Sequence, residues 1–170
     1  MEMLLSASDI REGVKRVAQA INKDYENKPL TIIGVMTGSI IFLSDLIRLL
    51  DMPLRVGCIQ IKSYEETKRG ELAKTTNLSL DVKGHDVLLV DDIFDTGHTM
   101  AWLKNYVSSE GAKTVSSVCL LTKNGTQETG ETPCYIAFEI PNKFVIGYGL
   151  DFDETLRNLP YIAAFSDGEI

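Results

Sequence analysis

Three aspartates follow directly on an apolar run in residues 87–99, which read VLLVDDIFDTGHT. Residues 87–90 have the unalternated β-branched and leucine pattern of a strand that is buried on both faces. Asp91, Asp92 and Asp95 cannot continue such a core, because an unpaired buried carboxylate is very costly. We therefore expect the strand to end at Val90, where the chain reaches the surface with concentrated negative charge.

The Asp-Thr-Gly-His-Thr segment at the end of this stretch has the features of a phosphate-binding loop. Gly97 lets the backbone approach an anion closely, and the helix that follows offers free N–H groups at its N-terminus. Thr96 and Thr99 add hydroxyl donors, while Asp91 and Asp92 can accept hydrogen bonds from hydroxyl groups near the phosphate. A ribose 5-phosphate meets both demands, with its phosphate on the loop and its 2′- and 3′-hydroxyls on the carboxylates.

Other interpretations of the acidic stretch are possible from these residues alone. The acids could simply cap a helix, although three carboxylates against an apolar strand exceed what a cap needs. A phosphoacceptor receiver domain also ends a strand in paired acids, but there the pair belongs to the first strand, and here it lies beyond the midpoint of the chain. A Walker phosphate loop, G-x-x-x-x-G-K-[ST], is absent.

The composition limits the function classes. The net charge of −7 argues against a nucleic-acid surface, where a basic stripe is expected. Three cysteines without a Cys-x-x-Cys pair indicate neither a disulfide framework nor a zinc site, so we expect a reducing cytoplasm. The start of the chain lacks signal-peptide features, and Asp45 and Arg48 break the most apolar stretch, so no membrane span is expected.

The elements that must position the acidic stretch alternate between strand and helix. This order predicts an α/β fold with a doubly wound, mainly parallel sheet and flanking helices, in a single domain of 170 residues. We expect the segments around 1–10 and 135–170 to form a small cap beside this sheet. The expected helices are a first one opened by a Ser6–Asp9 capping box, then 40–50 and 99–110. The expected strands are 30–36, 54–61, 76–80, 87–90, 114–122, 135–139, 144–147 and 161–165.

LLVDDIFDTGHT closely resembles the phosphoribosyl-pyrophosphate motif of type I phosphoribosyltransferases, which is an apolar run, two acids, two residues and Asp-Thr-Gly-x-Thr. Further segments occur in the order seen in hypoxanthine-guanine phosphoribosyltransferases, so that the resemblance spans nearly the whole chain. These are VMTGSIIFLSDLIR (35–48), KSYEETKRG (62–70), LLTKN (120–124) and FEIPNKFVIGYGLDFDETLRNLPYI (138–162).

The resemblance implies purine salvage: transfer of ribose 5-phosphate from phosphoribosyl pyrophosphate to N9 of a 6-oxopurine, giving IMP or GMP and pyrophosphate. It implies Mg²⁺ as cofactor and a homodimer or homotetramer. The non-enzyme alternative is a regulator of the same fold that binds RNA or nucleotide. Related adenine and uracil enzymes and the pyrimidine-operon attenuator lack an acid at the position of Asp95, which therefore favours the purine enzyme.

The resemblance also implies roles for single residues. Asp95 matches the general acid/base beside purine N7, and Lys123 the donor to the purine 6-oxygen. The implied ribose 5-phosphate site comprises Asp91, Asp92, Asp95, Thr96, Gly97, His98 and Thr99. The implied purine site comprises Lys123, Phe144, Val145 and Asp151, and the pyrophosphate site Thr37, Gly38 and Arg157. The implied metal-contacting acids are Asp91, Asp92 and Asp151.

Two loops complete the expected site. Residues 63–75 are polar and without periodicity, and the resemblance makes them a lid over the ribose, with Ser63 and Tyr64 as its family residues. In the first loop, human-type enzymes carry Leu-Lys-Gly where this chain has Met36-Thr37-Gly38. The family's turn contains a cis peptide there and offers backbone amides to pyrophosphate, so we expect backbone binding without the lysine side chain.

Overall fold

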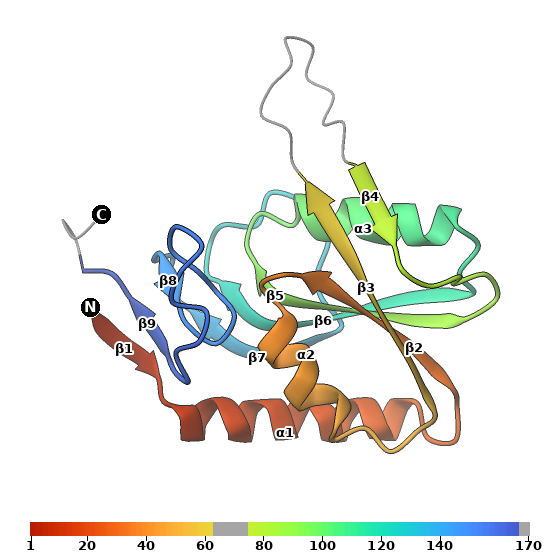
Figure 1. Cartoon of the computed structure of the whole chain (residues 1–170), viewed down its shortest axis with the longest axis horizontal. Coiled ribbons are helices and arrows are strands. Elements are labelled where there is room, and N and C mark those ends of the chain that lie inside the picture. The colour runs from red at the N-terminus through yellow and green to blue at the C-terminus, as the bar shows by residue number, and fades with distance from the viewer. Residues whose placement is uncertain (63–74, 167–170) are drawn as a thin grey trace, which may run out of the picture.

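The computed structural model describes residues 1–62 and 75–166, and its centre is a twisted sheet between two layers of helix (Figure 1). In the described part, six strands lie in the order β4-β3-β2-β5-β6-β7. All neighbouring pairs are parallel except β3 and β4. The strands are β2 (Leu30–Met36), β3 (Leu54–Lys62), β4 (Thr75–Leu78), β5 (Asp86–Phe94), β6 (Thr114–Lys123) and β7 (Tyr135–Ile140). The predicted doubly wound fold is confirmed.

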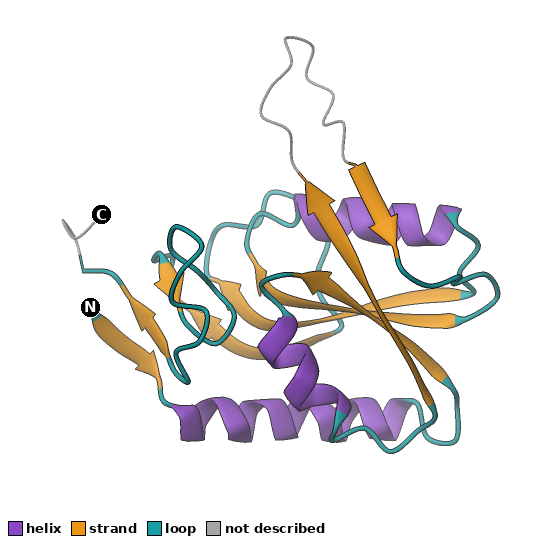
Figure 2. Ribbon diagram, viewed as in Figure 1, coloured by secondary structure: helices purple, strands orange, loops and turns teal. Residues whose placement is uncertain are grey.

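Helices cover both faces of the sheet (Figure 2). Helices α1 (Ala7–Asp24) and α2 (Ile40–Ile47) pack on one face, and α3 (His98–Ser109) packs on the other. Successive residues of a strand point to opposite faces, so Leu88 belongs to the core below α1 and α2 and Leu89 to the core below α3. No described helix has both the length and the apolar character needed to cross a membrane.

The first helix begins where the sequence predicts. The Ser6 hydroxyl accepts a hydrogen bond from the Asp9 amide at 3.2 Å, and the Asp9 carboxylate accepts one from the Ser6 amide at 2.9 Å. This reciprocal capping box satisfies two backbone donors that the helix itself cannot pair. It fixes the N-terminal end of α1 directly after residues 2–5, which belong to a second, smaller sheet described below.

The order of the strands creates a crevice at the carboxyl ends of β2 and β5. The chain leaves β2 through α2 toward β3 on one side, and it returns to pair β5 with β2 on the other side. In an open α/β sheet ligands bind at such a switch point, because the two connections diverge and leave space between them.

Strand β5 is longer than predicted, and it carries two of the acids with it. The strand does not end at Val90 but runs to Phe94, since its parallel pairing with β6 continues through Asp91 opposite Cys119 and Ile93 opposite Leu121. Asp91 is only 8% exposed. Its Oδ1 accepts a hydrogen bond from the Asp92 amide at 2.9 Å, and this local donor supports a carboxylate inside the strand.

A second sheet in the order β1-β9-β8 lies beside the main one, at the end of the molecule where Figure 1 marks N and C. Its strands are β1 (Glu2–Leu5), β9 (Ile162–Ala164) and β8 (Val145–Ile146), and all its pairs are antiparallel. We call this sheet with residues 147–161 the cap. The expectation that the whole of 135–170 lies outside the main sheet is wrong for β7, which pairs with β6 and extends that sheet. The expected lid lies outside the described residues, apart from Thr75 in β4.

Candidate active site

A cavity of about 480 Å³ lies at the carboxyl ends of β2 and β5, where the strand order predicts a ligand site. It is built from four segments: the end of β2 with the turn after it, the end of β3, the acidic end of β5 with the loop after it, and the start of α3. Its lining residues are Val35, Met36, Gly38, Ile61, Asp91, Asp92, Ile93, Phe94, Asp95, Thr96, Gly97, His98, Thr99 and Met100. The whole predicted ribose 5-phosphate set therefore lines one cavity.

The phosphate loop joins β5 to α3 and needs a glycine. Gly97 precedes the first residue of α3 and has φ of +92°, in the left-handed region that favours glycine. As the N-cap residue it has no side chain to pair with the N–H groups of the first turn, where the His98 amide donates to Thr96 Oγ1 at 3.5 Å and residues 98–100 line the cavity. The loop thus has the geometry of an anion site at a helix N-terminus.

Asp91 and Asp92 are two adjacent carboxyl groups that line the cavity. Burial and the neighbouring Asp92 carboxylate raise the pKa of Asp91 well above its ordinary value. Burial also raises the pKa of Asp92, and hydrogen bonds and the charge of Arg157 only partly offset this effect. Two adjacent carboxyl groups with raised pKa values are typical of a site that binds a cation or accepts hydrogen bonds from hydroxyl groups.

The turn after β2 packs directly on Asp92. A Cβ atom added at Gly38 would lie 1.8 Å from Asp92 Oδ2, so any larger residue at this position must displace the Asp92 carboxylate. The peptide bond between Met36 and Thr37 is cis, as the family resemblance implies. The Thr37 side chain is exposed, and the backbone of this turn rather than that side chain borders the cavity.

Asp95 and Lys123 form an ion pair between the ends of β5 and β6. Lys123 Nζ donates to Asp95 Oδ2 at 3.0 Å, with 15% of the lysine side chain and 42% of the aspartate side chain exposed. Burial acts to raise the pKa of Asp95, but hydrogen bonds from Thr126 and Lys123 and the lysine charge outweigh it and lower this pKa. The carboxylate is thus held ionised next to a cationic donor.

An aromatic cluster joins Phe152 of the cap to Phe144, directly before β8, and Phe165, directly after β9. Phe144 is 45% exposed, and its ring centroid lies 5.9 Å from that of Phe152, edge to face, and 5.8 Å from that of Phe165. The next residue, Val145, begins β8 and is buried. An exposed aromatic face held by two other rings can stack on a flat apolar ligand.

The Arg157 side chain is held by two contacts within the cap. Its Nη2 lies 2.9 Å from Asp151 Oδ1, and its Nη1 donates to the Gly149 carbonyl at 2.7 Å. Gly149 in turn approaches the turn so closely that an added Cβ would lie 2.0 Å from the Gly38 carbonyl oxygen. Both Asp151 oxygens are engaged, because Oδ2 accepts a hydrogen bond from the Glu154 amide at 3.0 Å.

The predicted site residues differ in their position relative to the cavity. Thr37, Lys123, Phe144, Val145, Asp151 and Arg157 do not line the cavity. Ion pairs or close backbone contacts connect three of them to it: Lys123 through Asp95, and Arg157 with Asp151 through Gly149 and Gly38. Ser63 and Tyr64 lie outside the described residues.

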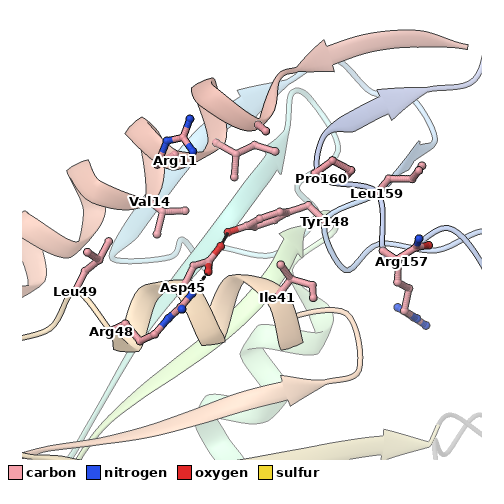
Figure 3. Close-up of a pocket in the computed structure, with 13 residues that line it drawn as sticks. Arg11, Val14, Ile41, Asp45, Arg48, Leu49, Tyr148, Arg157, Leu159 and Pro160 are labelled. Atoms are coloured by element: carbon pink, nitrogen blue, oxygen red, sulfur yellow. Dashed lines mark hydrogen bonds and ion pairs between the residues drawn. The ribbon is translucent and has the colours of Figure 1, made fainter.

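Two features of the structure were not predicted from the sequence. The loop after β6 contacts the phosphate loop through Thr126, Glu128 and Thr129, although no periodicity or motif distinguishes it. A second, mainly apolar cavity of about 560 Å³ lies between α1, α2 and the cap (Figure 3). Across it, the Tyr148 hydroxyl donates to Asp45 Oδ2 at 2.5 Å and so connects the cap to α2.

Comparison with known proteins gives one consistent family. The model of the phosphoribosyl transferase domain family matches residues 1–153. A curated hypoxanthine-guanine phosphoribosyltransferase of Lactococcus lactis subsp. lactis is 37% identical over 163 residues, which is 95% of this chain and 88% of that protein. The similarity therefore extends over nearly the full length of both.

Two solved structures have the same fold. A hypoxanthine-guanine phosphoribosyltransferase of Bacillus anthracis superposes with a TM-score of 0.91 at 32% identity, covering 98% of this chain and 99% of the other. A hypoxanthine phosphoribosyltransferase of Trypanosoma cruzi, in complex with the product IMP, also gives a TM-score of 0.91, at 33% identity over 100% of this chain and 96% of the other.

Proposed function

This chain belongs to the phosphoribosyl transferase domain family, and from that premise we propose that it is a hypoxanthine-guanine phosphoribosyltransferase of purine salvage. It transfers ribose 5-phosphate from phosphoribosyl pyrophosphate to N9 of hypoxanthine or guanine. The bond from the ribose C1 to pyrophosphate breaks, the bond from C1 to N9 forms, and the purine loses a proton. The products are IMP or GMP and pyrophosphate.

The observation that carries this proposal is the contact of Lys123 Nζ with Asp95 Oδ2 at 3.0 Å. It places a donor that cannot accept beside a carboxylate that can accept. The 6-oxygen and N7 occupy the same edge of a 6-oxopurine, so Lys123 can donate to the oxygen while Asp95 accepts a proton or hydrogen bond at N7. The lowered pKa of Asp95 means that this carboxylate is ionised near neutral pH and so is available as an acceptor at N7, although it is a weak base.

We assign the ribose and its phosphate to the cavity at the carboxyl ends of β2 and β5. The phosphate sits on the N–H groups at the start of α3, with Thr96 and Thr99 as hydroxyl donors. Asp91 and Asp92 accept the 2′- and 3′-hydroxyls of the ribose. In this arrangement the purine lies beside Asp95 and Lys123, next to the bound ribose.

The remaining assignments use the turn after β2 and the cap. Backbone amides at Thr37 and Gly38 bind pyrophosphate together with Arg157, whose planar guanidinium suits paired phosphate oxygens. Phe144 stacks on the purine, and the Val145 backbone reads its edge. The close contact of Gly38 with Gly149 holds the turn after β2 against the cap.

Mg²⁺ is the cofactor we propose, bound together with pyrophosphate. The described residues contain no cluster of three or more side chains that could hold a metal alone. The adjacent carboxylates of Asp91 and Asp92 nevertheless fit Mg²⁺, which takes one or two carboxylates, several waters and substrate phosphate oxygens. Asp151 would contribute from the cap. When bound, the ion neutralises charge on the leaving pyrophosphate.

We further propose a homodimer or homotetramer in the cytoplasm. The mainly apolar cavity between α1, α2 and the cap, which we call the groove, would be a contact between copies (Figure 3). The groove combines apolar side chains with Arg11, Arg48 and Asp45, so one surface offers apolar area and both signs of charge to its own copy. Leu49→Asp, at a residue 42% exposed, should lower the mass seen by light scattering. Val56→Asp, at an exposed residue elsewhere, should not.

The test of the function is a spectrophotometric assay with phosphoribosyl pyrophosphate, Mg²⁺ and hypoxanthine, guanine, xanthine or adenine supplied singly. We expect turnover with hypoxanthine and guanine, loss of turnover on chelation of Mg²⁺, and none with adenine. Absence of turnover with every base, together with RNA binding, would instead identify a regulator of the same fold.

A further inference from the structure

The loop after β6 contains a segment, residues 126–131, that we call the strap. Two of its backbone amides donate to the same acceptor in the phosphate loop: the Glu128 amide to the Thr96 carbonyl at 2.9 Å, and the Thr129 amide to that carbonyl at 3.3 Å. Thr126 Oγ1 donates to the neighbouring Asp95 carbonyl at 3.2 Å. The strap therefore holds the carbonyl groups of two successive phosphate-loop residues.

Side chains of the strap add to this contact. Glu128 Oε2 lies 2.8 Å from His98 Nε2, at the first residue of α3. Thr129 Oγ1 lies 2.2 Å from the point that a Cβ of Gly97 would occupy, so this side chain packs against the Gly97 backbone. The strap thus contacts four consecutive residues of the phosphate loop, from Asp95 to His98.

The strap is itself fixed to two rigid elements. Thr126 Oγ1 lies 3.3 Å from the Lys123 carbonyl at the end of β6, and Gln127 also donates to this carbonyl. At its other end Glu131 forms an ion pair with Lys104 of α3, in which the two side chains are 24% and 19% exposed. Because it is anchored at both ends, the strap can resist movement of the loop between them.

The planar peptide group determines what this contact does. The C=O and N–H of one trans peptide unit point in opposite directions. When the Thr96 carbonyl is held against the strap, the N–H of Gly97 must point away from it, toward the cavity that Thr96 and Gly97 line. The strap thus determines the direction of a donor that an anion in the cavity would use.

We propose that the strap is a positioning element of the phosphate site, which sets the affinity for the 5-phosphate of ribose by orienting the Thr96–Gly97 peptide. This inference rests on the function proposed above. It names Glu128, Thr129 and the Lys104–Glu131 pair as residues that act through the loop without touching the substrate. The expected effect is on the affinity for ribose phosphates and not on that for the purine.

Charge reversal across the anchoring pair tests this role. Lys104→Glu and Glu131→Lys each put like charges together in a partly buried place, and the double variant restores an opposite pair. We measure the Kd of ribose 5-phosphate by calorimetry, the KM of phosphoribosyl pyrophosphate and of hypoxanthine, and the thermal unfolding of each variant. Lys113→Glu is the matched control, since Lys113 is 67% exposed and lies 3.7 Å from Asp86 away from the strap.

Each single variant should weaken ribose 5-phosphate binding about tenfold or more, the change expected when one hydrogen bond to a charged group is lost. The KM of hypoxanthine should change less than twofold, and the double variant should restore tight binding. Glu128→Gln, a milder variant, should give a smaller loss in the same direction if the reversals do not fold. Unchanged ribose 5-phosphate binding in folded variants, or an equal rise of both KM values, would overturn the proposal. A wild type that binds ribose 5-phosphate but lacks transferase activity would count against the proposed function alone.

Discussion

Replacing Lys123 with alanine should make the protein less able to distinguish hypoxanthine from adenine. The lysine ammonium has donors but no acceptor, so it pairs with a 6-oxygen but opposes the 6-amino group of adenine. Only 15% of this side chain is exposed, and water therefore cannot replace the missing partner when adenine is bound. Sites of this kind discriminate by as much as about 10⁴–10⁵.

The size of the change follows from the pairing of Lys123. A hydrogen bond to a charged group contributes about 1.5–3 kcal/mol, which corresponds to a loss of roughly 10–150-fold in kcat/KM for hypoxanthine. The variant also deprives Asp95 of its cationic partner. The resulting change at N7 affects both bases and cancels in the ratio of their kcat/KM values, and the 42% exposed carboxylate stays solvated. The ratio itself should therefore fall at least about tenfold.

The assay is kcat/KM for hypoxanthine and adenine in the wild type, Lys123→Ala and a control. Lys113→Ala removes the same charge from an exposed position that does not line the cavity, and it should leave the ratio unchanged. A wild type that uses both bases equally well, or a ratio that survives in folded Lys123→Ala, would refute the assignment of Lys123 as the reader of the 6-oxygen.

Three further changes have defined outcomes. Asp95→Asn should retain ribose 5-phosphate binding in calorimetry and lower kcat roughly 10²-fold or more, as loss of a general base does. Gly38→Ala should displace Asp92 and raise the KM of phosphoribosyl pyrophosphate in steady-state kinetics. Because the raised pKa of Asp91 makes the folded state bind more protons than the unfolded state, stability should fall as pH rises through the window between its ordinary and raised values. Asp91→Asn should therefore raise the Tm of the metal-free protein at neutral pH by about 2–4 °C, the shift expected for roughly 1 kcal/mol in a chain of this size.

The sequence was sufficient for elements whose pattern depends on local physics. The strand over residues 30–36 has the predicted bounds, and the capping box at Ser6 starts α1 as expected. Residues 95–97 join β5 to α3 as the sequence predicts, because a glycine-containing turn between a buried strand and a helix is a local signal.

Features that depend on distant partners could not be predicted. Asp91 stays inside β5 because β6 continues to pair with it, and nothing in residues 87–95 reveals that neighbour. The membership of β7 in the main sheet depends in the same way on β6. The contact of the strap with the phosphate loop includes two backbone amides, for which every residue type except proline is equally suited.

The cap is assembled from parts of the chain that are far apart, and this determines when it can fold. In β1 and β9, Met3 pairs with Ala163, whereas in β2 and β3 Leu30 pairs with Leu54. Closing the loop between Met3 and Ala163 costs about 1.7 kcal/mol more in chain entropy than closing the loop between Leu30 and Leu54. The sheet that forms in this way has strands only two to four residues long. The main sheet, with its shorter crossovers, can form first and carry the phosphate loop in place. The side that we assign to the purine should therefore complete last in folding and open first in local unfolding.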